Sequence, residues 1–216
     1  MRAFDTAFFD LDGTLADTLP LIYEAFDQAF MPVLGHRFTD TEIRAMFGPP
    51  DLQIIRDHVP VEHADAAIER YNAHYSLRHD DLVAAFAGIA ALLERLQATG
   101  YWLGVITGKS RSTAIVSLDK TGLHRFFRVI YAGDDVAKQK PDPEAVIKLL
   151  NDAGVPASDR AVIIGDSAAD VLAGRAAGIK TIGVTWGSPD HHELDASVPD
   201  FRVSTVEELS ALLLAR

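Results

Sequence analysis

The chain has 216 residues, of which 48% are hydrophobic and 24% are charged, and these proportions exclude a disordered or fibrous protein. It contains no cysteine, which excludes disulfide frameworks, thiolate metal sites and cysteine nucleophiles. The 20 basic and 31 acidic residues give a formal net charge of −11, so we expect no nucleic acid and no membrane among its partners. Without a long apolar run or a signal-peptide pattern, we expect a cytoplasmic protein, as a monomer or homodimer.

The first expected element is a buried strand over residues 7–9, and a long helical interval follows it. No convincing strand lies between residues 17 and 85, where apolar periodicity predicts helices over 19–30, 39–46 and 61–77. Thr39 and Glu42 form a possible capping box at the start of the second helix. Because so long an interval is not a loop, we expect residues 17–85 to form a helical cap inserted into a core of residues 1–16 and 86–216.

Beyond the cap, short apolar runs alternate with helical patterns. The runs predict buried strands over residues 102–106, 129–131, 161–164 and 181–184. The helices are expected over 89–97, 142–151 and 168–177, with Pro143 at a first helical position, and 187–192 is expected to be a surface loop. Such alternation implies right-handed crossovers and a parallel sheet covered on both faces. The expected fold class is α/β, a doubly wound parallel sheet with an inserted α-helical cap.

Two carboxylates, Asp10 and Asp12, stand at the end of the first strand in a D-x-D-G-T pattern completed by Gly13 and Thr14. In open α/β sheets, ligands bind at the carboxyl ends of the strands. An Asp-Gly pair alone indicates only a turn, but four fixed residues match by chance in roughly one such chain per thousand. Because two acids packed together need a cation, the pattern predicts a hard divalent ion with oxygen ligands, such as Mg²⁺.

A second pair of acids, Asp166 and Asp170, follows the strand over 161–164. The spacing of four puts Asp170 on the same side of the helix that begins there. Taken alone, these acids suit a helix cap as well as a ligand site. Beside Asp10 and Asp12 the ligand interpretation is favoured, because all four acids converge on one edge of the sheet.

Groups suited to phosphate follow other strands. Thr107 and Gly108 come after the strand over 102–106, so a hydroxyl and the amides of the next helix start can hold phosphate oxygens. Lys140 lies in a loop just before a helix, on the side where the acids gather. A surface lysine is usually only solvated, but this placement favours a role at the site.

These motifs, in this order, resemble the haloacid dehalogenase superfamily of aspartate-nucleophile phosphatases, in the subgroup with a helical cap and closest to phosphoglycolate phosphatases. The resemblance implies that Asp10 is the nucleophile and a metal ligand. It implies that Asp12 is the general acid and base and also binds the metal through its backbone carbonyl. Asp166 would be the remaining metal ligand, and Asp170 would support the metal shell. The implied cofactor is Mg²⁺.

For the substrate, the resemblance implies phosphate binding by Thr107 and Gly108 and charge neutralisation by Lys140. The expected reaction is hydrolysis of a small phosphorylated metabolite through an aspartyl-phosphate intermediate. Sugar-phosphate mutase, pyrophosphatase and nucleotidase activities of the same superfamily stay open, as does a binding module without turnover. A P-loop is excluded, because Leu103 stands where its first glycine is required.

The residues that select the substrate are not fixed by the sequence. Cap residues and one core lysine are candidates to bind a carboxylate or sugar, although long basic side chains are mostly solvated: Arg56, Arg70, Tyr71, Arg78 and Lys109. The cap histidines lack a metal-ligand spacing. We therefore expect them on the cap surface: His58, His63, His74 and His79.

Overall fold

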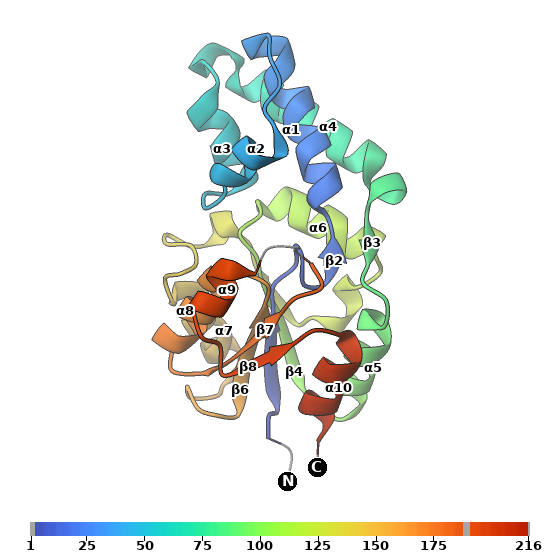
Figure 1. The fold of residues 1–216 in the computed structure, drawn as a ribbon, viewed down its shortest axis with the longest axis vertical. Coiled ribbons are helices and arrows are strands. Elements are labelled where there is room, and N and C mark those ends of the chain that lie inside the picture. The colour runs from blue at the N-terminus through green and yellow to red at the C-terminus, as the bar shows by residue number, and fades with distance from the viewer. Residues whose placement is uncertain (1–2, 188–190, 216) are drawn as a thin grey trace.

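A computed structural model describes residues 3–187 and 191–215 and shows a parallel sheet with a helical bundle above one end (Figure 1). The sheet has six strands, in the order β5-β4-β1-β6-β7-β8, and every pairing in it is parallel. The strands are β1 (Thr6–Phe9), β4 (Trp102–Ile106), β5 (Val129–Tyr131), β6 (Ala161–Gly165), β7 (Lys180–Val184) and β8 (Phe201–Val203). The predicted α/β fold and its five strands are confirmed. Edge strand β8 was not predicted, because it is short and two of its three residues are exposed.

Both faces of the sheet are covered, because successive side chains of a strand point to opposite faces. Ala7 and Phe9 of β1 pack into one core with α5 (Ile89–Ala98), α6 (Arg111–Lys120) and α10 (Val206–Leu214). Phe8 packs into a second core with α7 (Glu144–Ala153) and α8 (Ala168–Ala176). This two-sided burial explains why β1 is apolar throughout.

Four of the five helices between β1 and β4 bury a separate core of their own. They are α1 (Leu19–Leu34), α2 (Asp40–Ala45), α3 (Asp51–His58) and α4 (Val61–Leu82). Phe26 and Tyr71 meet at the centre of this bundle, with their rings 4.9 Å apart. The three predicted cap helices are confirmed, and the capping box of Thr39 and Glu42 is present. The short helix α3, which begins after Pro50, was not predicted.

Two very short strands connect the bundle to the sheet. β2 (Ala16–Asp17) pairs with β3 (Ala84–Ala85) in antiparallel register, with Ala16 opposite Ala85. The prediction that residues 17–85 contain no strand is therefore wrong at both ends of the interval. Strands of two residues are too short to show periodicity in a sequence.

The remaining elements bring small corrections. Helix α7 begins at Glu144, so Pro143 is its N-cap residue and not its first helical residue. Short 3₁₀ helices lie at His124–Phe126 and Gly133–Asp135, and α9 spans His192–Ala196. The loop expected over 187–192 falls partly on residues 188–190, which lie outside the described residues. Among the described helices none is long and apolar enough to cross a membrane.

Candidate active site

The parallel register brings three strand ends to one edge of the sheet. β1 lies between β4 and β6, with Phe9 paired to Val105 and to Ile164. The residues that follow these strands therefore leave the sheet side by side, and the backbone N–H of Asp10 still donates to the Ile164 carbonyl at 2.8 Å. Asp10, Thr107 and Asp166 meet at this edge, as the sequence predicts.

Three carboxylates form a compact group there. One oxygen each of Asp10, Asp166 and Asp170 lies within 4.8 Å of the others. Asp170 sits in the first turn of α8, and its Oδ2 accepts hydrogen bonds from the Ser167 backbone N–H (3.1 Å) and hydroxyl (2.5 Å). The helix-cap interpretation is thus correct for Asp170, and its other oxygen, Oδ1, pairs with the Lys140 ammonium.

Lys140 is the cation paired with this group. Its Nζ lies 3.1 Å from Asp10 Oδ1 and 2.5 Å from Asp170 Oδ1, and it donates to the Ile106 carbonyl at 3.4 Å. The buried ammonium keeps its charge: burial opposes ionisation, but Asp10 and Asp170 outweigh it and raise the pKa of Lys140 above its usual value. One ammonium faces three carboxylates, so negative charge is in excess.

This excess of negative charge contributes to the raised pKa values of Asp10 and Asp166. Burial raises the pKa of Asp10 well above its usual value, and Asp170 and Asp166 raise it further against the opposing effect of Lys140. Burial and the neighbouring Asp170 raise the pKa of Asp166 to about 7. Buried like charges of this kind are stabilised by a bound cation.

Two glycines allow the acids to approach the backbone. Gly13 has a φ of +73°, and a Cβ at this position would lie 2.2 Å from Asp166 Oδ2. A Cβ at Gly165 would lie 2.1 Å from Asp170 Cγ. The site is thus shaped so that carboxylate oxygens converge on one point, and oxygen donors are the ligands that Mg²⁺ prefers. The residues present fit such an ion.

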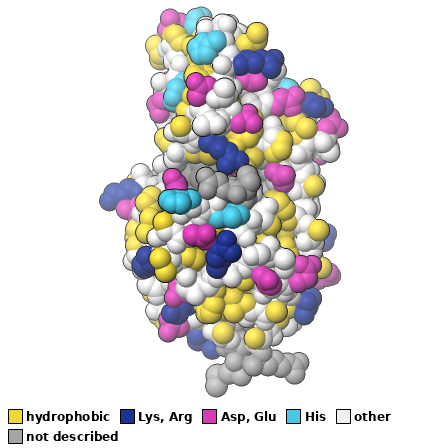
Figure 2. Space-filling view, in the orientation of Figure 1, with side chains coloured by type: hydrophobic (Ala, Val, Ile, Leu, Met, Phe, Trp, Pro, Cys, Tyr) yellow, Lys and Arg dark blue, Asp and Glu magenta, His cyan; other side chains and the backbone are white. Residues whose placement is uncertain are grey.

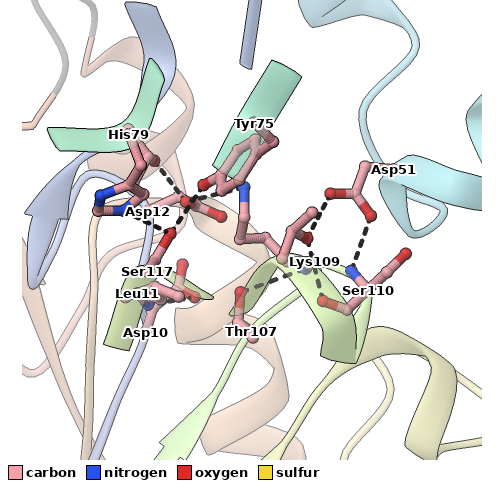
Figure 3. Close-up of polar contacts among 12 residues, drawn as sticks. Asp10, Leu11, Asp12, Asp51, Tyr75, His79, Thr107, Lys109, Ser110 and Ser117 are labelled. Carbon is pink, nitrogen blue, oxygen red and sulfur yellow. Dashed lines mark hydrogen bonds and ion pairs between the residues drawn. The ribbon is translucent and has the colours of Figure 1, made fainter. Parts of the chain in front are cut away.

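The side chain of Asp12 lies outside the group of three and faces the cap. Its Oδ1 accepts a hydrogen bond from the Thr18 hydroxyl. The same oxygen lies 3.4 Å from Lys109 Nζ (Figure 3). Lys109 is only 4% exposed, and its Nζ lies 4.7 Å from the centre of the Tyr75 ring. The expectation that long basic side chains are solvated is therefore wrong for Lys109, which the cap covers.

The cap and the core also meet at a buried carboxylate outside the group of three. Asp51, the first residue of α3, accepts hydrogen bonds from the Ser110 backbone N–H (2.9 Å), the Thr113 hydroxyl (2.6 Å) and the Tyr71 hydroxyl (3.2 Å). In return, the Ser110 hydroxyl accepts a hydrogen bond from the Leu52 N–H at 3.2 Å. Asp51 was not predicted from the sequence, although the preceding prolines Pro49 and Pro50 mark a helix start that could have indicated it.

Other cap residues differ from their expected places. His79 is 1% exposed and lies 3.3 Å from the Ser117 hydroxyl, so its prediction as a surface residue is wrong. Since α4 continues to Leu82, five residues beyond its predicted end, His79 lies inside the helix that packs against α6. The cap arginines bind other cap groups: Arg56 pairs with Asp65, Arg70 donates to the Gln28 and Ala29 carbonyls, and Arg78 pairs with Glu24 and Asp81.

Comparison with known proteins decides the family. Residues 7–184 match the family model described as haloacid dehalogenase-like hydrolase. The chain belongs to this family. It is 35% identical over 201 residues to the pyrophosphatase PpaX of Bacillus velezensis, covering 93% of this chain and 92% of the relative. The protein is therefore an enzyme of the hydrolase class, and the binding-module alternative is set aside.

Solved structures share the fold of this chain. A haloacid dehalogenase-like hydrolase from Streptococcus pneumoniae is 30% identical, with a TM-score of 0.78 over 98% of this chain and 99% of that one. A predicted phosphoglycolate phosphatase from Haemophilus somnus is 23% identical, with a TM-score of 0.83 over 94% of each chain. At that identity the second likeness concerns the fold alone.

Proposed function

We propose that the protein is a Mg²⁺-dependent phosphatase that hydrolyses small phosphorylated metabolites through an aspartyl-phosphate on Asp10. The observation that carries this proposal is the position of the Asp10 carboxylate. It stands at the end of the central strand β1, 3.1 Å from the Lys140 ammonium and grouped with Asp166 and Asp170. A nucleophile, a neutralising cation and a set of oxygen ligands are the parts that phosphoryl transfer requires.

The metal would be held by the Asp10 and Asp166 carboxylates and the Asp12 backbone carbonyl, with Asp170 in support. When bound, Mg²⁺ supplies positive charge that offsets the repulsion between Asp10 and a phosphate dianion. Lys140 adds a second positive charge beside Asp10 Oδ1. The Thr107 hydroxyl and the Gly108 amide would hold the phosphate oxygens, since both follow β4 at the same sheet edge.

The two steps follow from this arrangement. An Asp10 oxygen attacks phosphorus, the bond from phosphorus to the leaving oxygen breaks, and the Asp12 carboxyl gives its proton to that oxygen. Asp12 then takes a proton from a water molecule as the water attacks the phosphorus of the aspartyl-phosphate. Phosphate leaves, and Asp10 and Asp12 return to their starting states.

The first substrate to test is pyrophosphate, because the curated relatives at about one third identity carry that activity in their name. Phosphoglycolate is the second, because the sequence motifs resemble phosphoglycolate phosphatases most closely. On the face shown in Figure 2, basic side chains are scattered among acidic ones and do not gather into one patch. This distribution suits a small substrate that is bound inside the molecule.

Residues 17–85 would act as a unit that covers the core site and selects the leaving group. Support comes from their separate hydrophobic core and from the pairing of β2 with β3, which joins both ends of the unit to the core at one place. When such a cap closes, water is kept from the reacting groups.

The test is the pair of variants Asp10→Asn and Asp5→Asn. Asp10→Asn should fold and lose at least about 1000-fold in kcat with p-nitrophenyl phosphate and Mg²⁺, because the nucleophile is gone. Asp5→Asn, which removes a surface partner of Arg160 at the other end of β1, should keep its activity. Acid quenching during turnover should trap phosphate on a peptide containing Asp10 in the unaltered enzyme and in Asp5→Asn, but not in Asp10→Asn. Ordinary turnover by Asp10→Asn would refute the proposed function.

A further inference from the structure

A second buried ammonium at the junction of cap and core has no role in the steps above. Lys109 lies in the loop between β4 and α6, and its side chain is 3% exposed. Its Nζ makes no hydrogen bond with any described residue and has one ion-pair partner, the Asp12 carboxylate at 3.4 Å, although an ammonium carries three donors. Leaving buried donors without acceptors is costly, so this group is suited to bind an anion.

Lys109 lies beside the residue that is proposed to protonate the leaving group. The ammonium lies 3.4 Å from Asp12 Oδ1, and Asp12 is the residue proposed to protonate the leaving oxygen. Lys140, in contrast, contacts Asp10 and Asp170 around the transferred phosphoryl group. In the proposed mechanism, the two buried lysines would therefore lie at opposite ends of the bond that breaks.

The surroundings of Lys109 also limit the size of what it can bind. The Tyr75 ring covers the ammonium from the cap side at 4.7 Å, and the Tyr75 hydroxyl is held 2.8 Å from the Ser117 hydroxyl in α6 (Figure 3). Asp51 fixes the neighbouring Ser110 to the cap. Such close packing favours a compact leaving group, with its charge only a few bonds from the leaving oxygen.

We infer that Lys109 is a specificity-determining residue that binds an anionic group on the leaving group. The substrate class is then a phosphate ester or anhydride whose leaving group carries a second phosphate or a carboxylate. This inference rests on the proposed function and narrows it. Neutral leaving groups such as phenols make no ion pair with Lys109 and gain nothing from it.

The experiment compares Lys109→Met with Lys138→Met, a matched loss of a lysine whose side chain is 73% exposed. With Mg²⁺, kcat/KM is measured for pyrophosphate, phosphoglycolate and phenyl phosphate. Lys109→Met should lower kcat/KM for an anionic leaving group roughly 10- to 100-fold more than for phenyl phosphate, as expected for a lost charged hydrogen bond. The substrate with the larger selective loss identifies the anion as phosphate or carboxylate. Lys138→Met should leave the ratios of kcat/KM among the three substrates unchanged.

An equal loss on all three substrates would overturn the inference and make Lys109 a residue that only positions Asp12. If Lys109→Met does not fold, Lys109→Gln replaces it. A second readout avoids turnover: in the Asp10→Asn background, Lys109→Met should weaken binding of methylenediphosphonate but not of methylphosphonate, as measured by calorimetry. Equal weakening of both would also overturn it. Failure of the proposed function appears separately, as turnover that survives Asp10→Asn.

Discussion

Asp51 in the cap accepts a hydrogen bond from the backbone N–H of Ser110 in the core, at 2.9 Å. Ser110 stands three residues after Thr107, in the loop that the proposed mechanism places around the phosphate. The same Asp51 carboxylate also accepts from Thr113 of α6 and Tyr71 of α4. A single buried carboxylate thus links the cap to the loop that follows β4.

The first prediction concerns this link. Asp51→Asn places an amide donor against hydrogen-bond donors, which costs about 1–3 kcal/mol where the groups stay buried. We expect kcat/KM to fall about 10-fold or more and amide exchange at Ser110 to quicken, because the closed cap is less populated. Asp57→Asn, an exposed change on the same helix, is the control. Equal kcat/KM in the two variants would show that the link does not matter for closure.

The second prediction concerns pH and the metal. In the metal-free enzyme, Asp166 has a pKa of about 7, whereas its carboxyl ordinarily titrates near 3.8. Between these values the native state binds more protons than the unfolded chain, so this contribution to stability is full at low pH and is lost as the pH rises through about 7. We therefore expect the metal-free Tm to fall between about pH 5 and about pH 8 more in the unaltered protein than in Asp166→Asn.

Mg²⁺ should reverse this loss. Because the ion binds the deprotonated carboxylates, it should raise the Tm of the unaltered protein at about pH 8 and have little effect on Asp166→Asn. Asp159→Asn, an exposed acid in a contact with Lys180, should respond to Mg²⁺ as the unaltered protein does. A Mg²⁺ shift of equal size in Asp166→Asn would remove Asp166 from the metal site.

The third prediction compares two glycines in order to separate the effect of backbone strain from the effect of side-chain crowding. Gly13 and Gly35 both have positive φ, +73° and +76°. A Cβ at Gly35 meets nothing within 4 Å, whereas one at Gly13 meets Asp166 at 2.2 Å. Gly35→Ala should therefore lower the free energy of unfolding only through backbone strain, by about 1–2 kcal/mol. This corresponds to a fall of roughly 2–8 °C in Tm.

Gly13→Ala should lower the free energy of unfolding more than Gly35→Ala does, and it should also displace the Asp166 carboxylate. We expect it to abolish the Mg²⁺-dependent rise in Tm, which Gly35→Ala should retain. Thermal unfolding with and without Mg²⁺ measures both effects. If Gly13→Ala keeps the full Mg²⁺ response, then the close approach of Gly13 to Asp166 is not what shapes the site.

The sequence predicted the parts of the site that depend on strand ends. Asp10 and Asp166 follow apolar runs, and parallel pairing alone brings such positions together. Lys109 and Asp51 were different, because the partners that bury them come from segments 20 or more residues away. Local patterns carry no information about such partners. The length of α4, and with it the burial of His79, was missed because polar residues near its end hide the helical period.

The pairing of Ala16 with Ala85 makes the whole cap equivalent to the loop of a β-hairpin. Both chain ends of this loop leave the core about 5 Å apart, the spacing of paired strands. A turn of two residues could close the same gap. Caps of other sizes can therefore be exchanged at this point without changing the order of the core strands, which gives a route to chimaeras that join this core to the cap of another enzyme.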